Sequence, residues 1–144
     1  MIPTSQRTPQ QLYQAWIDLW NGRFELAHEI IAANCRVHQA PSDPQNPLEL
    51  RGPDGVLQMI HMGHAPFSDL VFRIELEPIV EGNRLAARWI SEGRYKGDFP
   101  GATVSPGTPI TFGGIDIMRI EDGKIAEYWV SSDGIYLLAQ LGAL

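Results

Sequence analysis

Two aspartates in the C-terminal third of the chain could carry acid–base chemistry. Asp116 lies within the apolar run 110–120, and Asp133 follows the next run, 125–131. A carboxylate among apolar neighbours is costly unless it is paired or lines a polar pocket. If both carboxyl groups enter one pocket, their repulsion and unequal burial would separate their pKa values. The two groups would then divide the roles of acid and base.

Each aspartate also has a structural interpretation. Asp116 could form an ion pair with Arg88 or Arg119. Asp133 precedes Gly134 and could cap the N-terminus of a last helix. The two interpretations of Asp133 predict opposite titration, because an apolar pocket raises the pKa of a carboxyl group whereas backbone donors at a cap lower it.

Histidines offer further candidates. His38 belongs to a short alternating segment, 35–39, where it could serve a ligand or be structural. His61 and His64 are three residues apart and could share one face of a helix. A metal site would need further ligands in register, and the sequence has neither a His-Glu-x-x-His pattern nor cysteine partners. No metal site is therefore predicted.

Aromatic residues gather on the expected first helix and the facing strands. Tryptophan and tyrosine carry polar atoms that a dry core must satisfy, and a pocket for a flat ligand needs such walls. Most of these side chains also suit a plain core, but we expect at least two to line a cavity. The candidates are Tyr13, Trp16, Trp20, Trp89, Tyr95 and Trp129.

Periodicity and turn residues define the elements that would hold these side chains. Thr8 to Gln11 has the form of a capping box, which starts a helix that Asn21-Gly22 ends. Alternation from Leu70 and the Asp-Gly pair at 122–123 predict antiparallel strands. The expected helices are 9–20, 24–34, 53–61 and 134–141, and the expected strands are 35–39, 70–77, 84–96, 110–120 and 125–131. This order predicts an α+β domain whose helices cover one concave face of a curved sheet.

Composition limits the classes of function. A chain of 144 residues forms one domain, 1–144. Its formal charge of -6 repels nucleic acid and anionic membranes. No apolar run is long enough to span a membrane, and Cys35 is the single cysteine of the chain. We therefore expect a cytoplasmic protein. Charged residues are only 19% of the chain, against about 25% in typical domains. Either a partner covers part of the surface or uncharged polar groups line an interior.

Several motifs together resemble a known family. They are the segment Phe112 to Ile120, the turn Asp122-Gly123-Lys124-Ile125, then Trp129, Asp133 and the ending Gln140-Leu141-Gly142. This set resembles the SnoaL-like polyketide (ester) cyclases of the nuclear transport factor 2-like superfamily. Residues 87–89 and 93–99 are similar to a further family segment, in which a histidine is replaced here by Tyr95.

The resemblance implies a fold, a chemistry and a partner. The fold is a cone-shaped barrel, in which a strongly curved and mainly antiparallel sheet wraps around N-terminal helices and dimerises through its outer face. The chemistry is cofactor-independent cyclisation of a small molecule, with Asp133 as the acid/base. Asp116 and His38 would assist it, with His38 orienting a substrate oxygen or bonding to Asp133. Arg88 and the six aromatic candidates would contact the substrate.

Two other classes of function stay open. Related folds carry epoxide hydrolases, which use an Asp/Arg/Asp arrangement that Asp116, Arg88 and Asp133 could imitate, and acid/base enzymes of the ketosteroid isomerase type. The other class is a dimeric domain that binds a small molecule without converting it.

Overall fold

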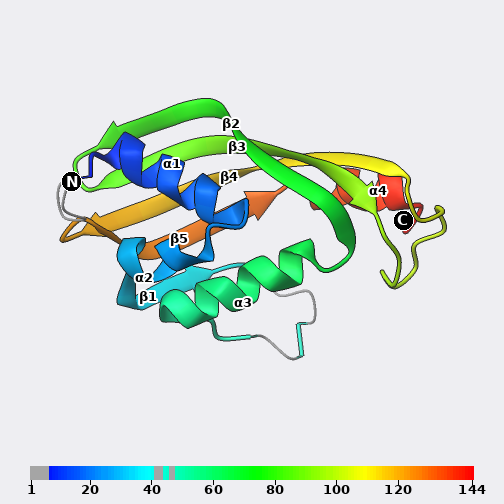
Figure 1. The fold of residues 1–144 in the computed structure, drawn as a ribbon, viewed down its shortest axis with the longest axis horizontal. Helices are drawn as coiled ribbons and strands as arrows, with labels where there is room; N and C mark the ends of the chain where they lie inside the picture. The colour runs from blue at the N-terminus through cyan, green and yellow to red at the C-terminus, as the bar shows by residue number, and fades with distance from the viewer. Residues whose placement is uncertain (1–6, 41–43, 46–47) are drawn as a thin grey trace.

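The computed structural model describes residues 7–40, 44–45 and 48–144 (Figure 1). The chain forms an α+β domain in which four helical elements precede strands β2 to β5 and a short helix follows them. The helices are α1 (Pro9–Trp20), the 3-10 helix η2 (Phe24–Leu26), α2 (Ala27–Ile30), α3 (Gly52–His64) and α4 (Gly134–Leu141). The strands are β1 (Ile31–His38), β2 (Phe67–Glu81), β3 (Arg84–Tyr95), β4 (Pro109–Glu121) and β5 (Lys124–Ser132).

The five strands form one curved sheet in the order β1-β5-β4-β3-β2. All neighbours are antiparallel except β1 and β5, which run parallel. Register shifts interrupt the pairing of β2 with β3 and of β4 with β5, and such bulges bend and twist a sheet. The curved, mainly antiparallel sheet and the N-terminal helices are confirmed. The cone is unclosed, with β1 and β2 as its two edges.

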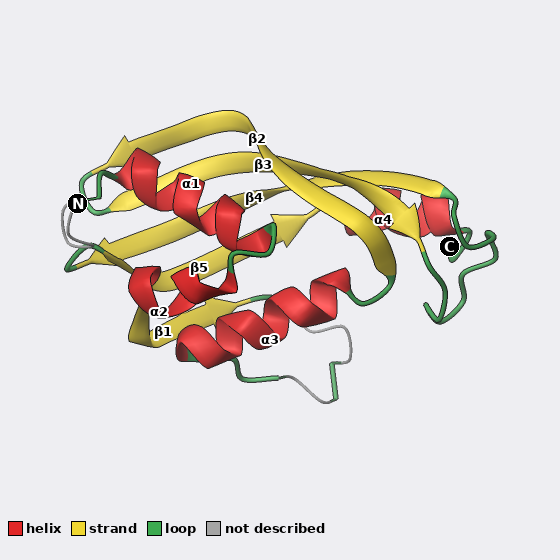
Figure 2. Cartoon of the chain, in the orientation of Figure 1, coloured by secondary structure: helices red, strands yellow, loops and turns green. Residues whose placement is uncertain are grey.

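Helices α1, α2 and α3 lie on the concave face of this sheet (Figure 2). Helix α1 starts at the predicted capping box: the Thr8 side chain accepts from the Gln11 backbone N–H at 3.0 Å, and the Thr8 N–H donates to the Gln11 side chain at 3.0 Å. Its inner side contributes Leu12, Trp16 and Leu19, each no more than 1% exposed, to the core. Among the described helices, none is long and apolar enough to cross a membrane.

The predicted helix 24–34 is wrong in its second half. Helix α2 ends at Ile30, and β1 begins at Ile31, which pairs with Ile125 of β5. Both isoleucines are essentially fully buried, so strand pairing at the sheet edge overrides the local helical pattern. The predicted strand 70–77 is also too short, because β2 runs from Phe67 to Glu81 and bends at its bulges.

A side chain of helix α4 bonds to β4 beyond the C-terminal end of β5. The last paired residue of β5, Ser132, lies opposite Gly114, so Thr111 of β4 lies beyond the end of β5. The Gln140 side chain takes the place of a strand there: it accepts from the Thr111 N–H at 2.9 Å and donates to the Thr111 carbonyl at 2.7 Å. The Gln-Leu-Gly ending therefore secures β4.

Candidate active site

A buried carboxyl group lies at the centre of the domain. Asp116 occupies the middle of β4, opposite Ala87 of β3 and Val130 of β5, and is 1% exposed. Three side-chain donors reach it from three elements. Tyr128 donates to Oδ1 at 2.6 Å, the Trp89 indole donates to Oδ1 at 3.1 Å, and Tyr13 of α1 donates to Oδ2 at 2.8 Å. This carboxyl group is held by hydrogen bonds rather than by a cation.

Burial dominates the electrostatics of this group. Desolvation raises the pKa of Asp116 from 3.8 to about 6, although the hydrogen bonds from Tyr128, Tyr13 and Trp89 favour the charged form. Burial and the neighbouring Asp116 carboxylate also raise the pKa values of Tyr128 and Tyr13 far above that of an ordinary tyrosine, so both phenols stay protonated. Near neutral pH the carboxyl group can therefore both give and take a proton.

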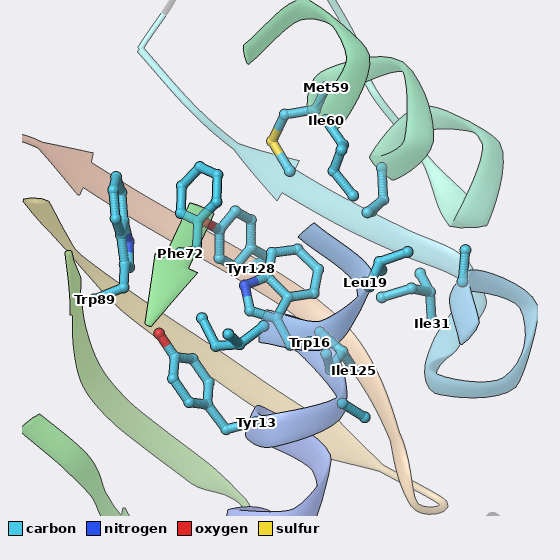
Figure 3. Close-up of a cluster of buried hydrophobic side chains, with 14 of the residues drawn as sticks. Tyr13, Trp16, Leu19, Ile31, Met59, Ile60, Phe72, Trp89, Ile125 and Tyr128 are labelled. Atoms are coloured by element: carbon cyan, nitrogen blue, oxygen red, sulfur yellow. The ribbon is translucent and has the colours of Figure 1, made fainter. Parts of the chain in front are cut away.

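Asp116 borders a cavity of about 110 Å³ between the sheet and the helices. Its inner part is formed by Trp16, Tyr128 and Asp116 itself, each at most 2% exposed. Figure 3 shows the polar atoms of Tyr13 and Trp89 turned toward the region beside Tyr128, and both donate hydrogen bonds to Asp116. The other lining residues are Ile17, Trp20, Gln39, Met59, Gly63, Phe72, Trp89, Phe112, Val130 and Ser132.

A glycine pair in β4 makes room on both faces of the sheet. A Cβ atom on Gly114 would lie 2.4 Å from the Trp89 ring, so glycine is required for the indole to lie against β4 and reach Asp116. A Cβ atom on Gly113 would lie 2.8 Å from the Arg88 guanidinium on the opposite face. The Gly-Gly segment thus positions one side chain at the cavity and one on the outer face.

Asp133 lies away from this cavity. Its Oδ2 accepts from Arg88 at 3.0 Å, and Arg88 also donates to Glu75 at 2.7 Å. Arg88 and Trp89 are consecutive in β3, so their side chains point to opposite faces of the sheet. Asp133 precedes α4, yet its side chain makes no capping hydrogen bond. The structure therefore does not bring Asp133 and Asp116 together.

His38 also lies on the outer face. Its Nε2 is 2.6 Å from the Glu127 carboxylate, which in turn accepts from Arg119 at 3.2 Å. The hydrogen bonds of His38 and Arg119 hold the pKa of Glu127 below its usual value. The His38 ring stacks on Trp129, with ring centres 5.0 Å apart and planes 12° apart. His38 has no contact with Asp133 in this arrangement, since its partners are Glu127 and Trp129.

The remaining aromatic candidates divide between the cavity and the scaffold. Trp16, Trp20 and Trp89 line the cavity. Tyr13 is not one of the lining residues, but its hydroxyl donates a hydrogen bond to Asp116. The Tyr95 hydroxyl accepts from the Phe99 N–H at 2.9 Å and so fixes the loop that follows β3. Within the described part of the chain, no three His, Cys, Asp or Glu side chains form a cluster that could hold a metal.

Sequence reasoning did not single out Tyr128, although it makes the shortest hydrogen bond to Asp116. Phe72, Met59 and Phe112, which complete the cavity wall, were expected only as apolar residues or not at all. Hairpin register does not identify Tyr128, because the register at the Asp-Gly turn would place Trp129 on the face of Asp116 and a bulge then shifts the pairing.

Comparison with known proteins agrees with this architecture. The family model described as SnoaL-like polyketide cyclase matches residues 10–141. IdmH of Streptomyces antibioticus, provisionally described as a polyketide cyclase, is 27% identical, with a TM-score of 0.81 over 94% of this chain and 99% of its own. TsrD of Streptomyces laurentii is 28% identical, with a TM-score of 0.76 over 100% and 99%. A Bacillus cereus protein, also provisionally described as a polyketide cyclase, is 25% identical, with a TM-score of 0.74 over 93% and 80%. Among curated proteins, no match is found.

Proposed function

The chain belongs to the SnoaL-like polyketide cyclase family, and we propose that it closes a ring in a small carbonyl compound with Asp116 as its acid/base. One observation carries the proposal: of the described residues that line the cavity, Asp116 has the only carboxyl group. Its surroundings are the aromatic walls that suit a flat organic ligand.

Asp116 can perform both proton transfers of such a reaction. In its ionised form it takes a proton from a carbon next to a carbonyl group. The resulting enolate carbon forms a bond to a second carbonyl carbon, whose oxygen receives the electron pair. Asp116 then returns the proton to that oxygen, so the product is an isomer of the substrate. A pKa of about 6 keeps both forms of Asp116 populated near neutrality, and the reaction needs no redox partner.

Tyr128 and Trp89 would hold one carboxyl oxygen of Asp116 while Tyr13 holds the other. Three fixed donors keep the carboxyl group in one orientation toward the cavity, which is the pre-organisation that acid–base catalysis requires. The family resemblance assigned this role to Asp133. The ion pair of Asp133 with Arg88 on the outer face favours Asp116 instead.

Replacement of each aspartate by asparagine separates the two assignments. With a panel of aromatic polyketide-type ketones and esters as substrates, we expect Asp116→Asn to lose about 100-fold or more in kcat/KM. Asp133→Asn is the matched control and should keep most of the activity. The opposite pattern would contradict the assignment and return the acid/base role to Asp133.

A second candidate reaction is the movement of a proton between two carbons of one substrate, as in ketosteroid isomerases. A carboxyl group with a raised pKa beside a protonated tyrosine favours it, because both groups can stabilise an enolate oxygen. Exchange of a substrate C–H proton for solvent deuterium without ring closure would identify this reaction.

Epoxide opening is disfavoured, since Arg88 and Asp133 lie outside the cavity that holds Asp116. Uptake of labelled solvent oxygen into the product of an epoxide would support epoxide opening again.

The alternative of a domain that only binds its ligand has a simple test. A compound that binds in the cavity and is recovered unchanged, with equal affinity for wild type and Asp116→Asn, would support binding without chemistry. Turnover that Asp116→Asn abolishes would exclude it.

We also propose a homodimer through the outer face of the sheet. A row of residues crosses four strands there, with Ile79 opposite Ala86, Ala86 opposite Ile117 and Ile117 opposite Trp129. Ile79 and Ile117 are 68% and 43% exposed, which is unusual for isoleucines on one continuous surface. Sedimentation analysis should show a dimer for wild type and a monomer for Ile117→Asp. A wild-type monomer would refute this arrangement.

A further inference from the structure

The cavity has an inner end and an outer end with different characters. Asp116 and Tyr128 form the inner end, whereas the exposed residues Gln39 and Ser132 lie at the outer end. Trp20, which is half-buried, belongs to the outer part of the wall together with Gly63 of α3. A ligand that reaches Asp116 therefore extends toward the space beside Trp20.

Trp20 is held there by packing. Its ring lies 4.9 Å from the Phe72 ring and 6.2 Å from the Trp16 ring, measured between centres. A Cβ atom on Gly63 would be 3.1 Å from the Trp20 ring, so the ring packs directly on the α3 backbone. The His64 ring stacks with the Trp20 ring, with centres 6.2 Å apart, and its Nε2 is hydrogen-bonded to the Trp20 carbonyl at 2.8 Å.

Other rings of the wall are fixed more firmly. Tyr128 and Trp89 each donate a hydrogen bond to Asp116, and Trp16 is 1% exposed. By contrast, the Trp20 indole N–H has no hydrogen-bond partner among the described residues, and only van der Waals contact fixes the ring. Truncation of Trp20 therefore enlarges the cavity without removing a polar contact of the site.

The size of the cavity gives this ring a functional meaning. An apolar cavity of roughly 150 Å³ accommodates a benzene molecule, and the cavity here measures about 110 Å³. We propose that Trp20 is a specificity-determining residue, which limits the part of the ligand held in the cavity to about one aromatic ring. The inference rests on the proposed function only in taking this cavity as the substrate site.

Binding of ketones of graded size tests the proposal. The probes are acetophenone, with one ring, and 2-acetylnaphthalene, with two fused rings, and NMR titration measures Kd for wild type and Trp20→Ala. We expect Trp20→Ala to bind 2-acetylnaphthalene about tenfold more tightly than wild type, because it buries the second ring. Acetophenone should gain no affinity. A Kd ratio between the two ketones that is the same in both proteins would overturn the proposal.

Three control variants keep the test decisive. Trp129→Ala removes an indole from the outer face and should leave the ratio of the two Kd values unchanged. If this variant changes the ratio as Trp20→Ala does, the size limit does not belong to Trp20.

Trp20→Leu is a milder truncation, for use if Trp20→Ala folds poorly, and it should change the ratio of the two Kd values in the same direction. An unchanged ratio in folded Trp20→Leu also counts against the proposal. Repeating the titrations in Asp116→Asn separates size selection from catalysis, because binding selectivity should persist there even if Asp116 has no catalytic role.

Discussion

The buried Asp116 carboxyl group should give the folded chain a pH dependence of stability that asparagine removes. Its pKa rises from 3.8 to about 6 in the folded state, so the folded chain binds this proton more tightly than the unfolded chain does. Ionisation therefore favours unfolding. The cost is absent below about pH 4, grows as the pH rises, and is fully present above about pH 6, where it reaches about 3 kcal/mol.

Urea denaturation of wild type and Asp116→Asn at several pH values between 4 and 8 measures this cost. The free energy of unfolding of the variant minus that of wild type should increase by about 2.5 kcal/mol from pH 4 to pH 7. The difference between the two proteins cancels the pH-dependent contributions of other titrating groups to the free energy of unfolding. One of these groups is Glu127, whose lowered pKa stabilises the folded chain as the pH rises. A difference that is constant across this range would refute the reasoning, since it would mean that folding does not raise the pKa of Asp116.

Two further substitutions test the scaffold around the site. Gly114→Ala should destabilise the chain by about 1 to 3 kcal/mol and change its tryptophan fluorescence, because the new Cβ atom would overlap the Trp89 ring. Gly134→Ala, whose Cβ atom meets nothing within 4 Å, is the control in the same denaturation assay. Gln140→Leu should cost about 1 to 3 kcal/mol and speed hydrogen exchange of the Thr111 amide, which loses its acceptor. Unchanged exchange at Thr111 would contradict the role given to Gln140.

The sequence predicted the elements well because their signals are local. The capping box of α1 and the Asp-Gly turn between β4 and β5 each depend on a few neighbouring residues. The second helix was predicted too long because the pairing of Ile31 with Ile125 joins distant parts of the chain. Local preference carries no information on such a contact.

One bulge explains why the site was harder to predict. Next to the turn, Glu121 pairs with Lys124 and Ile120 with Ile125, a register that would place Trp129 opposite Asp116. The register then shifts by one residue, so that Asp116 pairs with Val130 and Ile117 with Trp129. A shift of one residue exchanges the two faces of a strand. The bulge therefore turns Tyr128 toward Asp116 and Trp129 toward the outer face. No residue spacing in the sequence predicts this bulge.

The hydrogen bond between Tyr13 and Asp116 joins residues 103 positions apart, and the contact of His38 with Glu127 joins residues 89 apart. Closing such long loops costs chain entropy before any contact offsets it, so pairings of this range slow folding. The first helix and the last strands must both be in place before the carboxyl group gains all its donors. Recovery of the site during refolding therefore reports the joining of the two ends of the domain, and lags behind the local hairpins β2–β3 and β4–β5.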